Sequence, residues 1–385
     1  LVLSSGNRES GSYGPGEDVC ATRVTPAGDV VDPYPNIQLG LSAHWQHRPA
    51  ASFDGERWLA VWVEQMALRE NDIRGVVLDA QGVPVAPSFT ICGAADYQSL
   101  PAVCAGDSGW LVAWQDYRTG GQLDKLYAAR VTRSGEVLDP DGLPVATSSN
   151  VNRYPAIAFD GTNWLVVFWT WVYPNYHING ARVTPSGSVL DPNGFDIVQA
   201  AYGTGWNNHV SLGLAFDGMN YLMVWPDYRN GHWDIYGARV TPSGSVLDSN
   251  GFTVCRAGGD QDFARLAFGS GRYLAAWHDT RGGDNVYATL VDPGGESSDT
   301  LGIRINPAAE DVDILPIVAV SRDRFVGGAC ESNGVAPREG EYADLLVIQR
   351  LSVHVHRKRE PQLQSPRGDH ECEHLRSISS RRVYP

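Results

Sequence analysis

Six polar side chains recur at nearly even spacing along the chain, and their types suit metal binding and general base chemistry. They are separated by intervals of 52 to 57 residues, and they comprise Gln46, Gln98, Asn152, His209, Gln261 and Asp313. Amide oxygens together with a carboxylate form the hard-oxygen environment that Ca²⁺ prefers, and a histidine can serve as a base or as a ligand. If the fold brings these six positions together, the sequence predicts a site for Ca²⁺ or another divalent cation.

The two titratable members, His209 and Asp313, carry the functional interpretation of this ring. Asp313, Asn152 and the three glutamines would hold the ion, and His209 or the nearby His47 would act as general base. The candidate catalytic residues are therefore His209, His47 and Asp313. The alternative is structural, because amides at the start of inner strands can bind water and cap backbone groups. The residues alone leave both interpretations open.

Aromatic side chains near these positions form a second group of candidates. The stretch WTWVYPNYH departs from the repeat, and Trp45 and Trp206 lie close to Gln46 and His209 in the sequence. Exposed aromatic rings stack on sugar faces or line apolar ligand pockets. The candidate ligand-binding residues are Trp45, Trp169, Trp171, Tyr173, Tyr176, His177 and Trp206. The alternative is that the rings of this stretch pack against the neighbouring repeat unit.

A repeated motif places an aspartate and an arginine two residues apart. Its three copies, WQDYR, WPDYR and WHDTR, begin at Trp114, Trp225 and Trp277. A carboxylate next to a guanidinium could do chemistry, but a pair repeated in successive units is better explained as a bridge that fixes each loop. We therefore interpret the motif as structural.

These candidates are embedded in a repeat that covers most of the chain. One unit contains the apolar segment PAIAF, an Asp-Gly turn that other units replace by an equivalent turn, and a second apolar segment, NWLVVFW. A variable loop, INGARVT, a Pro-Ser-Gly turn and SVLDPNGFDIV follow. Asp-Gly and Ser-Gly supply the backbone angles that tight hairpin turns need. Four antiparallel strands in a unit of about 50 residues are typical of a β-propeller blade.

The repeat count predicts an all-β chain folded as a six-bladed β-propeller of four-stranded antiparallel blades, with seven blades as the alternative. The units start near residues 46, 98, 152, 209, 261 and 313, and residues 1–45 resemble part of a blade. We expect this part-blade to complete the last blade and close the ring. The propeller domain would span residues 1–348, and the basic tail at 349–385 is expected to be disordered or non-native despite its His and Cys residues.

Composition narrows the range of partners. The formal net charge is −14, and a phosphate-binding surface needs clustered Lys and Arg, so nucleic acid and anionic membrane are not expected. There is no run of 18 apolar residues that would span a membrane. We expect a monomer, secreted or on the surface of a bacterial cell, that meets a small-molecule ester or a carbohydrate. The chain opens without Met, as a mature or truncated product would.

The six cysteines are compatible with one or two disulfides but do not require them. Cys92 falls in the last strand of one unit and Cys104 in the first strand of the next. A disulfide between them is plausible, and two buried free thiols are the alternative.

The segments DGTNWLVVFW and YGARVTPSGSVLD resemble the propeller-type repeats of secreted and surface proteins of myxobacteria and other bacteria. This resemblance covers nearly everything before the tail, and it implies the fold and an extracellular setting. The polar ring also looks like the layout of six-bladed calcium-dependent hydrolases such as paraoxonase, diisopropylfluorophosphatase and the lactonases. That similarity implies a catalytic Ca²⁺, although this ring carries glutamines where those families favour Asn, Asp and Glu.

Two functions are consistent with these features. The first is a metal-assisted hydrolase of small esters, lactones or phosphotriesters that acts at the mouth of the central channel, with the aromatic stretch as the wall around the leaving group. The second is a non-catalytic propeller that binds carbohydrate or protein, as lectins and adhesins do. The sequence favours the hydrolase, because binding by repetition should leave the loops more alike than they are.

Overall fold

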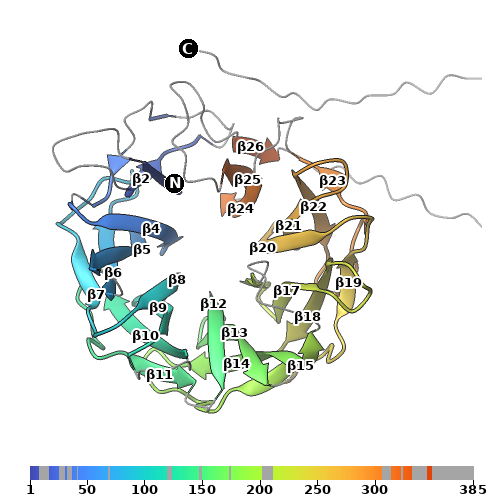
Figure 1. Cartoon of the computed structure of the whole chain (residues 1–385), viewed down its shortest axis with the longest axis horizontal. Coiled ribbons are helices and arrows are strands. Elements are labelled where there is room, and N and C mark those ends of the chain that lie inside the picture. The colour runs from blue at the N-terminus through green and yellow to red at the C-terminus, as the bar shows by residue number, and fades with distance from the viewer. Residues whose placement is uncertain are drawn as a thin grey trace, which may run out of the picture.

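The computed structural model describes residues 1–7, 17–25, 31–32, 37–40, 42–67, 70–118, 124–146, 150–172, 175–201, 211–305, 314–321, 324–331 and 345–348. These residues form strands, turns and connecting segments, and none of them lies in a helix. The sheets are arranged around a common centre, with the first strand of each blade innermost (Figure 1). The predicted all-β propeller is confirmed. A search of the described residues finds no helix of a length and hydropathy that would span a membrane.

Five blades each contain four antiparallel strands. Blade 1 comprises β4 (Trp45–Phe53), β5 (Trp58–Ala67), β6 (Glu70–Leu78) and β7 (Phe89–Cys92). Blade 2 comprises β8 (Gln98–Gly106), β9 (Gly109–Asp116), β10 (Lys125–Thr132) and β11 (Leu143–Ala146). Blade 3 comprises β12 (Val151–Phe159), β13 (Trp164–Val172), β14 (Asn175–Val183) and β15 (Phe195–Ala201). Blade 4 comprises β16 (Gly213–Phe216), β17 (Tyr221–Asp227), β18 (Asp234–Val240) and β19 (Phe252–Cys255), and blade 5 comprises β20 (Gln261–Gly269), β21 (Arg272–Asp279), β22 (Asn285–Val291) and β23 (Ile303–Arg304).

The two ends of the chain form three-stranded sheets. Blade 6 contains β24 (Ile314–Ser321), β25 (Arg324–Glu331) and β26 (Leu345–Ile348), and the N-terminal sheet contains β1 (Val2–Asn7), β2 (Glu17–Thr22) and β3 (Ile37–Gln38). All six predicted repeats therefore begin a sheet. Within the described residues, however, the N-terminal sheet has no ladder to blade 6 and stands as a separate seventh sheet beside β4. The prediction was that the N-terminal part-blade completes blade 6 and closes the ring. The described strands show no such pairing between the two sheets.

The Asp-Gly turns join the first two strands through a side-chain hydrogen bond. In blade 3, Asp160 Oδ1 accepts hydrogen bonds from the backbone N–H groups of Thr162 and Asn163, both at 2.7 Å. Gly161, which follows Asp160 directly, has φ = +90°, a backbone conformation that residues with a Cβ rarely adopt. Asp54 and Asp217 accept hydrogen bonds from the same two backbone offsets, so blades 1, 3 and 4 share this turn.

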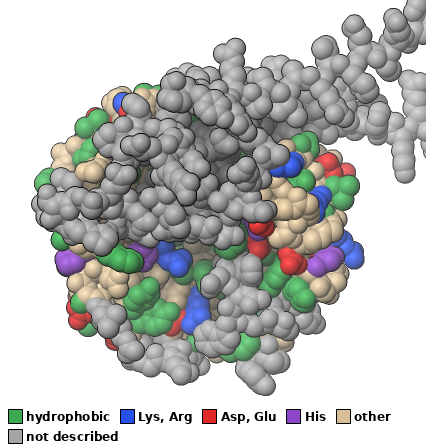
Figure 2. All heavy atoms as spheres, turned by 45° about the horizontal axis from the view of Figure 1, so that its top comes forward, with side chains coloured by type: hydrophobic (Ala, Val, Ile, Leu, Met, Phe, Trp, Pro, Cys, Tyr) green, Lys and Arg blue, Asp and Glu red, His purple; other side chains and the backbone are tan. Residues whose placement is uncertain are grey.

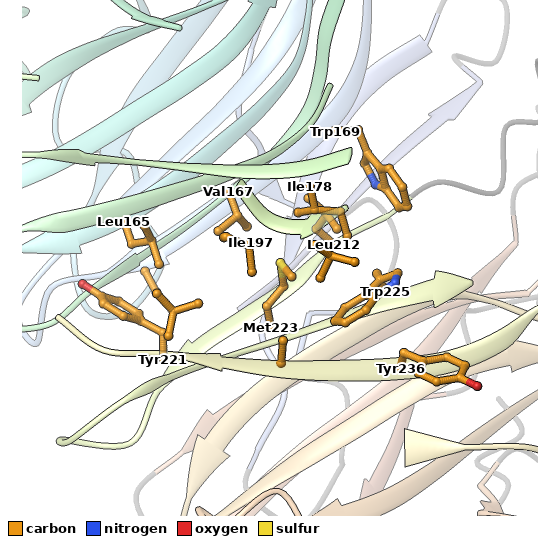
Figure 3. Packing of buried hydrophobic residues seen from close by; sticks show 14 residues of the cluster. Leu165, Val167, Trp169, Ile178, Ile197, Leu212, Tyr221, Met223, Trp225 and Tyr236 are labelled. Carbon is orange, nitrogen blue, oxygen red and sulfur yellow. The ribbon is translucent and has the colours of Figure 1, made fainter. Parts of the chain in front are cut away.

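Buried side chains pack between neighbouring blades. Figure 3 shows the cluster between blades 3 and 4, where Leu165, Val167 and Trp169 from β13 meet Met223 and Trp225 from β17. Trp169 is 3% exposed and lies at one end of this cluster. Its prediction as a ligand-binding residue is therefore corrected: the ring belongs to the core, because the alternation along β13 turns it toward blade 4.

A bulge interrupts the first strand of four blades close to its start. The pairing register shifts after His47, Ser99, Arg153 and Asp262. The next residue in each blade has a positive φ without being glycine: Arg48, Leu100, Tyr154 and Phe263. Such angles are uncommon and bulges re-aim side chains. The bulge thus separates a short segment that carries the polar ring from the remainder of each inner strand.

The possible disulfide between Cys92 and Cys104 is not present, since both residues are free thiols. Cys92 packs in the layer between blades 1 and 2, whereas Cys104 packs in the layer between blades 2 and 3. Desolvation raises the pKa of Cys104 to about 12, because its neutral thiol is favoured in an apolar layer. The disulfide does not form because β8 places the Cys104 side chain on the face of blade 2 that is turned away from Cys92.

Candidate functional site

The polar candidates gather at one end of the blades. At this end, which we call the mouth end, the first strand begins, the second ends and the third begins. In blade 2, Gln98 pairs with Asp116, which pairs with Lys125; in blade 5, Gln261 pairs with Asp279, which pairs with Asn285. The strand register thus brings residues from three segments of each blade together.

The four described amides of the predicted ring are fully buried, and each is hydrogen-bonded within the protein. Gln46 Oε1 accepts a hydrogen bond from Val19 N at 3.1 Å, and Asn152 Oδ1 accepts one from Thr170 Oγ1 at 3.0 Å. Gln261 Nε2 donates to Gly259 O at 2.9 Å, and Gln98 Nε2 donates to Ala95 O at 3.2 Å. These contacts support the structural interpretation of the amides, which tie the start of each inner strand to adjacent backbone.

The described ring residues do not form a ligand set for a cation as they stand. Among their side-chain oxygens only Gln98 Oε1 lacks a hydrogen-bond partner, and the described residues contain no cluster of three His, Cys, Asp or Glu side chains suited to a metal. Asp313 and His209 lie outside the described residues. The divalent cation therefore stays a prediction.

His47 is half-buried on β4, directly before the bulge. Burial, aided by the positive charge of Arg48, lowers the pKa of His47 from 6.5 to about 4. The imidazole is therefore neutral near pH 7, as a base or a metal ligand must be, although a pKa this low makes it a weak base.

His47 should make the folded protein sensitive to acid. Between pH 6.5 and 4 the unfolded chain binds a proton at this histidine that the folded chain does not, so stability is full above pH 6.5 and falls as the pH drops toward 4. Between pH 7.5 and pH 4.5 this shift corresponds to a loss of about 2 to 3 kcal/mol. Urea unfolding at pH 7.5 and pH 4.5 measures the loss, and His47→Gln should reduce it. An equal loss in wild type and variant would contradict this assignment.

The aromatic candidates divide into core, surface and half-buried residues. Trp45 is 52% exposed, whereas Trp171 and Tyr176 are half-buried and pack on each other with ring centroids 4.4 Å apart. His177 Nδ1 lies 3.6 Å from Asp196 Oδ1. Tyr173 and Trp206 lie outside the described residues. Trp171 and Tyr176 at the mouth end of blade 3 thus remain candidates for ligand contact.

The Asp-x-Arg motifs are internal braces, as predicted. In blade 4, Asp227 Oδ2 accepts hydrogen bonds from Trp225 Nε1 at 3.0 Å and Arg229 Nη2 at 2.6 Å, while Oδ1 accepts one from Arg229 Nε at 2.9 Å. The Arg229 guanidinium lies 4.0 Å from the centroid of the Tyr236 ring. Blades 2 and 5 repeat this arrangement. Because both carboxylate oxygens are engaged, the motif is unsuited to proton transfer.

A group that the sequence did not single out lies at the mouth end of blade 5. His278 Nδ1 is 2.7 Å from Asp262 Oδ1, and His278 Nε2 is 3.1 Å from Asp284 Oδ1. The side chain of Asp262 is 2% exposed, that of His278 11% and that of Asp284 36%. The imidazole is therefore held between a buried carboxylate and a solvent-exposed one.

The two carboxylates favour the charged form of this histidine. Burial alone would lower the pKa of His278, but the hydrogen bond and charge of Asp262 and the charge of Asp284 outweigh it and raise the pKa above its usual value. With both ring nitrogens donating, the imidazolium is the form that satisfies both contacts. A proton donor and a proton acceptor thus lie side by side near solvent.

Blade 2 shows how the same scaffold position is used without a histidine. Gln115 replaces His278, and Gln115 Nε2 donates to Asp124 Oδ2 at 3.0 Å. Asp124 is fully buried and pairs with Arg153 of blade 3. The charge of Asp124 is balanced by the Arg153 guanidinium, which cannot release a proton. Blades 2 and 5 therefore share the same strands at this position, but only blade 5 has a side chain there that can donate a proton.

One signal in the sequence could have identified this group. The residue after the repeated Trp or Phe is Val63, Gln115, Trp169, Pro226 or His278, so a titratable side chain occupies this position in one of five units. On the part of the surface shown in Figure 2, described acidic, basic and histidine side chains are interspersed with hydrophobic ones.

Comparisons with known proteins find similarity to solved structures only, and at low identity. No family model and no curated protein matches the sequence. A puromycin hydrolase is 16% identical with a TM-score of 0.48, covering 89% of this chain and 52% of its own, so this chain spans about half its length. TolB from Acinetobacter baumannii is 13% identical with a TM-score of 0.39 and coverages of 86% and 77%. A GH43 endo-arabinanase from Bacillus licheniformis is 13% identical with a TM-score of 0.35 and coverages of 64% and 91%.

Proposed function

We propose that the protein is a hydrolase of small esters and lactones, with Asp262, His278 and Asp284 as its acid and base group. The observation that carries this proposal is the imidazole between a buried and an exposed carboxylate at the mouth end of blade 5. Hydrolysis needs a base that removes a proton from water and an acid that protonates the leaving oxygen. Asp284 supports the first task and His278 the second.

The proposed reaction proceeds by attack of water on the acyl carbon. Asp284 accepts a proton from the water as its oxygen bonds to the carbonyl carbon. His278 Nε2–H donates its proton to the leaving-group oxygen as the acyl C–O bond breaks. Because Asp284 and His278 are 3.1 Å apart, the proton taken from water can then pass from Asp284 to His278 and restore the starting state. Asp262 keeps the imidazole charged and oriented throughout.

This assignment moves the acid–base role from the residues first predicted to a neighbouring position. His209 and Asp313 lie outside the described residues, and His47, which is neutral near pH 7, has no acidic proton to give to a leaving group. A divalent cation at the ring would add electrophilic assistance. The acid and base group of blade 5 requires neither this cation nor His209, Asp313 or His47. Phosphotriesters share the need for leaving-group protonation, which makes them a useful comparison substrate.

The test is a hydrolysis assay of the purified chain on aryl esters, γ- and δ-lactones and aryl phosphotriesters. We expect turnover of esters or lactones above the buffer rate, and parallel reactions with EDTA and with added Ca²⁺ measure any contribution from a cation. Turnover that His278→Asn does not change, or no turnover on any of these substrates, would overturn the proposal.

A further inference from the structure

An arginine on the innermost strand of blade 5 stands where the other blades have uncharged residues. Arg265 pairs with Ala276 of β21, in the first ladder pair after the bulge. The residues at the same ladder position of the other blades are Ala50, Ala102, Ala156, Gly213 and Ile317. The propeller therefore does not need a charged side chain at this position.

The alternation along β20 turns Arg265 toward blade 6. Its two neighbours in the strand, Ala264 and Leu266, pack in the layer between blades 4 and 5. Successive side chains of a strand point to opposite faces, so Arg265 lies on the other face. Since β20 is the innermost strand of its blade, Arg265 belongs to the inner wall of the propeller (Figure 1).

Arg265 carries a charge that no described acidic side chain balances. Within the residues that the structure describes, it forms no ion pair, and it donates one hydrogen bond, from Nη1 to the backbone O of Ala264 at 3.1 Å. In the same blade, by contrast, Arg281 holds Asp279 at 2.8 Å. Burial lowers the pKa of Arg265, yet the residue is only half-buried and still meets solvent. A guanidinium stays charged in proteins and has five N–H groups, so most of its donors remain for a ligand.

A second donor reaches the same carbonyl from blade 4. Ser211 is 7% exposed, and its Oγ donates to Ala264 O at 3.3 Å. Blade 4 can approach β20 this closely because Gly213 lies against the backbone of Arg265, where an added Cβ would be 3.0 Å from the Arg265 carbonyl carbon. A hydroxyl and a guanidinium thus converge at one point of the inner wall.

We propose that Arg265 and Ser211 bind the carboxylate of a small organic acid at the inner wall of the propeller. The guanidinium fork matches the two oxygens of a carboxylate and can donate parallel hydrogen bonds to them, and the serine hydroxyl can donate another. The uncharged, mostly small residues at the same level of the other inner strands suit the apolar remainder of such an acid.

The charge of the protein favours a monocarboxylate over phosphate or sulfate. The formal net charge of the chain is −14, so a dianion meets more repulsion than a monoanion does. Sites for dianions gather several cationic side chains or backbone N–H groups around the ligand. Arg265 is the one charged residue at its ladder position among the six blades, and one guanidinium balances one negative charge.

The test is calorimetric titration of the purified chain with hexanoate, benzoate and sulfate at constant ionic strength. Arg265→Ala installs the residue of blades 1 to 3 and should weaken binding of the preferred carboxylate by about tenfold or more, and Ser211→Ala by about threefold. Arg272→Ala removes an exposed arginine from the opposite end of the β20–β21 hairpin and should leave binding unchanged.

Stability without ligand separates this role from a structural one. Arg265→Ala removes an unpaired charge from an enclosed position, so its Tm should equal or exceed that of the wild type, and benzoate should raise the Tm of the wild type but not of this variant. Four outcomes would overturn the inference: no binding of either carboxylate by the wild type, undiminished binding by Arg265→Ala, a lower Tm of ligand-free Arg265→Ala, or sulfate bound as tightly as the carboxylates. The inference does not depend on hydrolysis. No ester or lactone is present in these titrations, so failure of the hydrolase proposal and failure of this one give different results.

Discussion

His278→Asn should lower the turnover number for the preferred ester or lactone by a factor of about 10² to 10⁴, the usual contribution of a general acid. Asparagine can keep the contact with Asp262, which is 2.7 Å from His278 Nδ1 in the wild type. It cannot protonate a leaving oxygen. The value of kcat should therefore fall with little change in KM, and the measurement is steady-state kinetics on the substrate found in the screen.

A histidine in the adjacent blade provides the matched control. His232 in blade 4 also lies beside a buried aspartate, with His232 Nδ1 3.3 Å from Asp234 Oδ1, but it has no second carboxylate in the described residues. His232→Asn should leave kcat unchanged. Equal losses in the two variants would show that histidines near the mouth end act through stability or ligand binding rather than through proton transfer.

The pH profile distinguishes a proton donor from a structural histidine. Because the neighbouring carboxylates raise the pKa of His278, its acid form persists above the usual range for histidine, and activity should decline only as the pH rises past this raised pKa. Asp262→Asn removes the main cause of the rise, so the alkaline decline should move to lower pH. An unchanged profile in Asp262→Asn would contradict the positioning role of Asp262.

Much of the scaffold was predictable because each unit repeats the residues that form its turns and inter-blade layers. The six predicted first strands correspond to β4, β8, β12, β16, β20 and β24. The Asp-Gly turns and the Asp-x-Arg braces also have the predicted structural roles. The N-terminal part-blade was harder to place, because strand pairing across the closure depends on segments far apart in the sequence rather than on the repeat.

The candidate site was less accessible from sequence, because it depends on register. Asp262 and His278 are 16 residues apart and become partners only because β20 and β21 pair at these positions, next to a bulge that shifts the register. Regular spacing directed attention to the amide ring, whose regularity reflects a shared backbone-capping role. His278 departs from the repeat, but its role as a proton donor could be proposed only once its partners Asp262 and Asp284 were known.

Asp227→Ala should destabilise the propeller by about 2 to 4 kcal/mol, because it leaves a buried indole N–H and a partly buried guanidinium without their acceptor. Asp227 is fully buried and accepts hydrogen bonds from the Trp225 indole and from the backbone and guanidinium of Arg229. Without it, an arginine lies against the Tyr236 ring with no carboxylate in that position, and a buried indole N–H loses its acceptor. Urea denaturation measures the change in the free energy of unfolding.

The second Asp–Arg pair of the same blade tests whether burial is what makes this brace strong. Asp248 and Arg239 also form bidentate hydrogen bonds, with Nε to Oδ2 at 2.8 Å, but their side chains are 19% and 25% exposed. Both arginine side chains are 25% exposed, but Asp248 is itself partly exposed and Asp227 also accepts from the buried Trp225 indole, so Asp248→Ala should lose only about 1 to 2 kcal/mol. Comparable losses would mean that the Asp227 brace owes its strength to hydrogen-bond geometry rather than to burial. A smaller loss in Asp227→Ala than in Asp248→Ala would contradict the assignment of the Asp-x-Arg motif as the principal internal brace of blade 4.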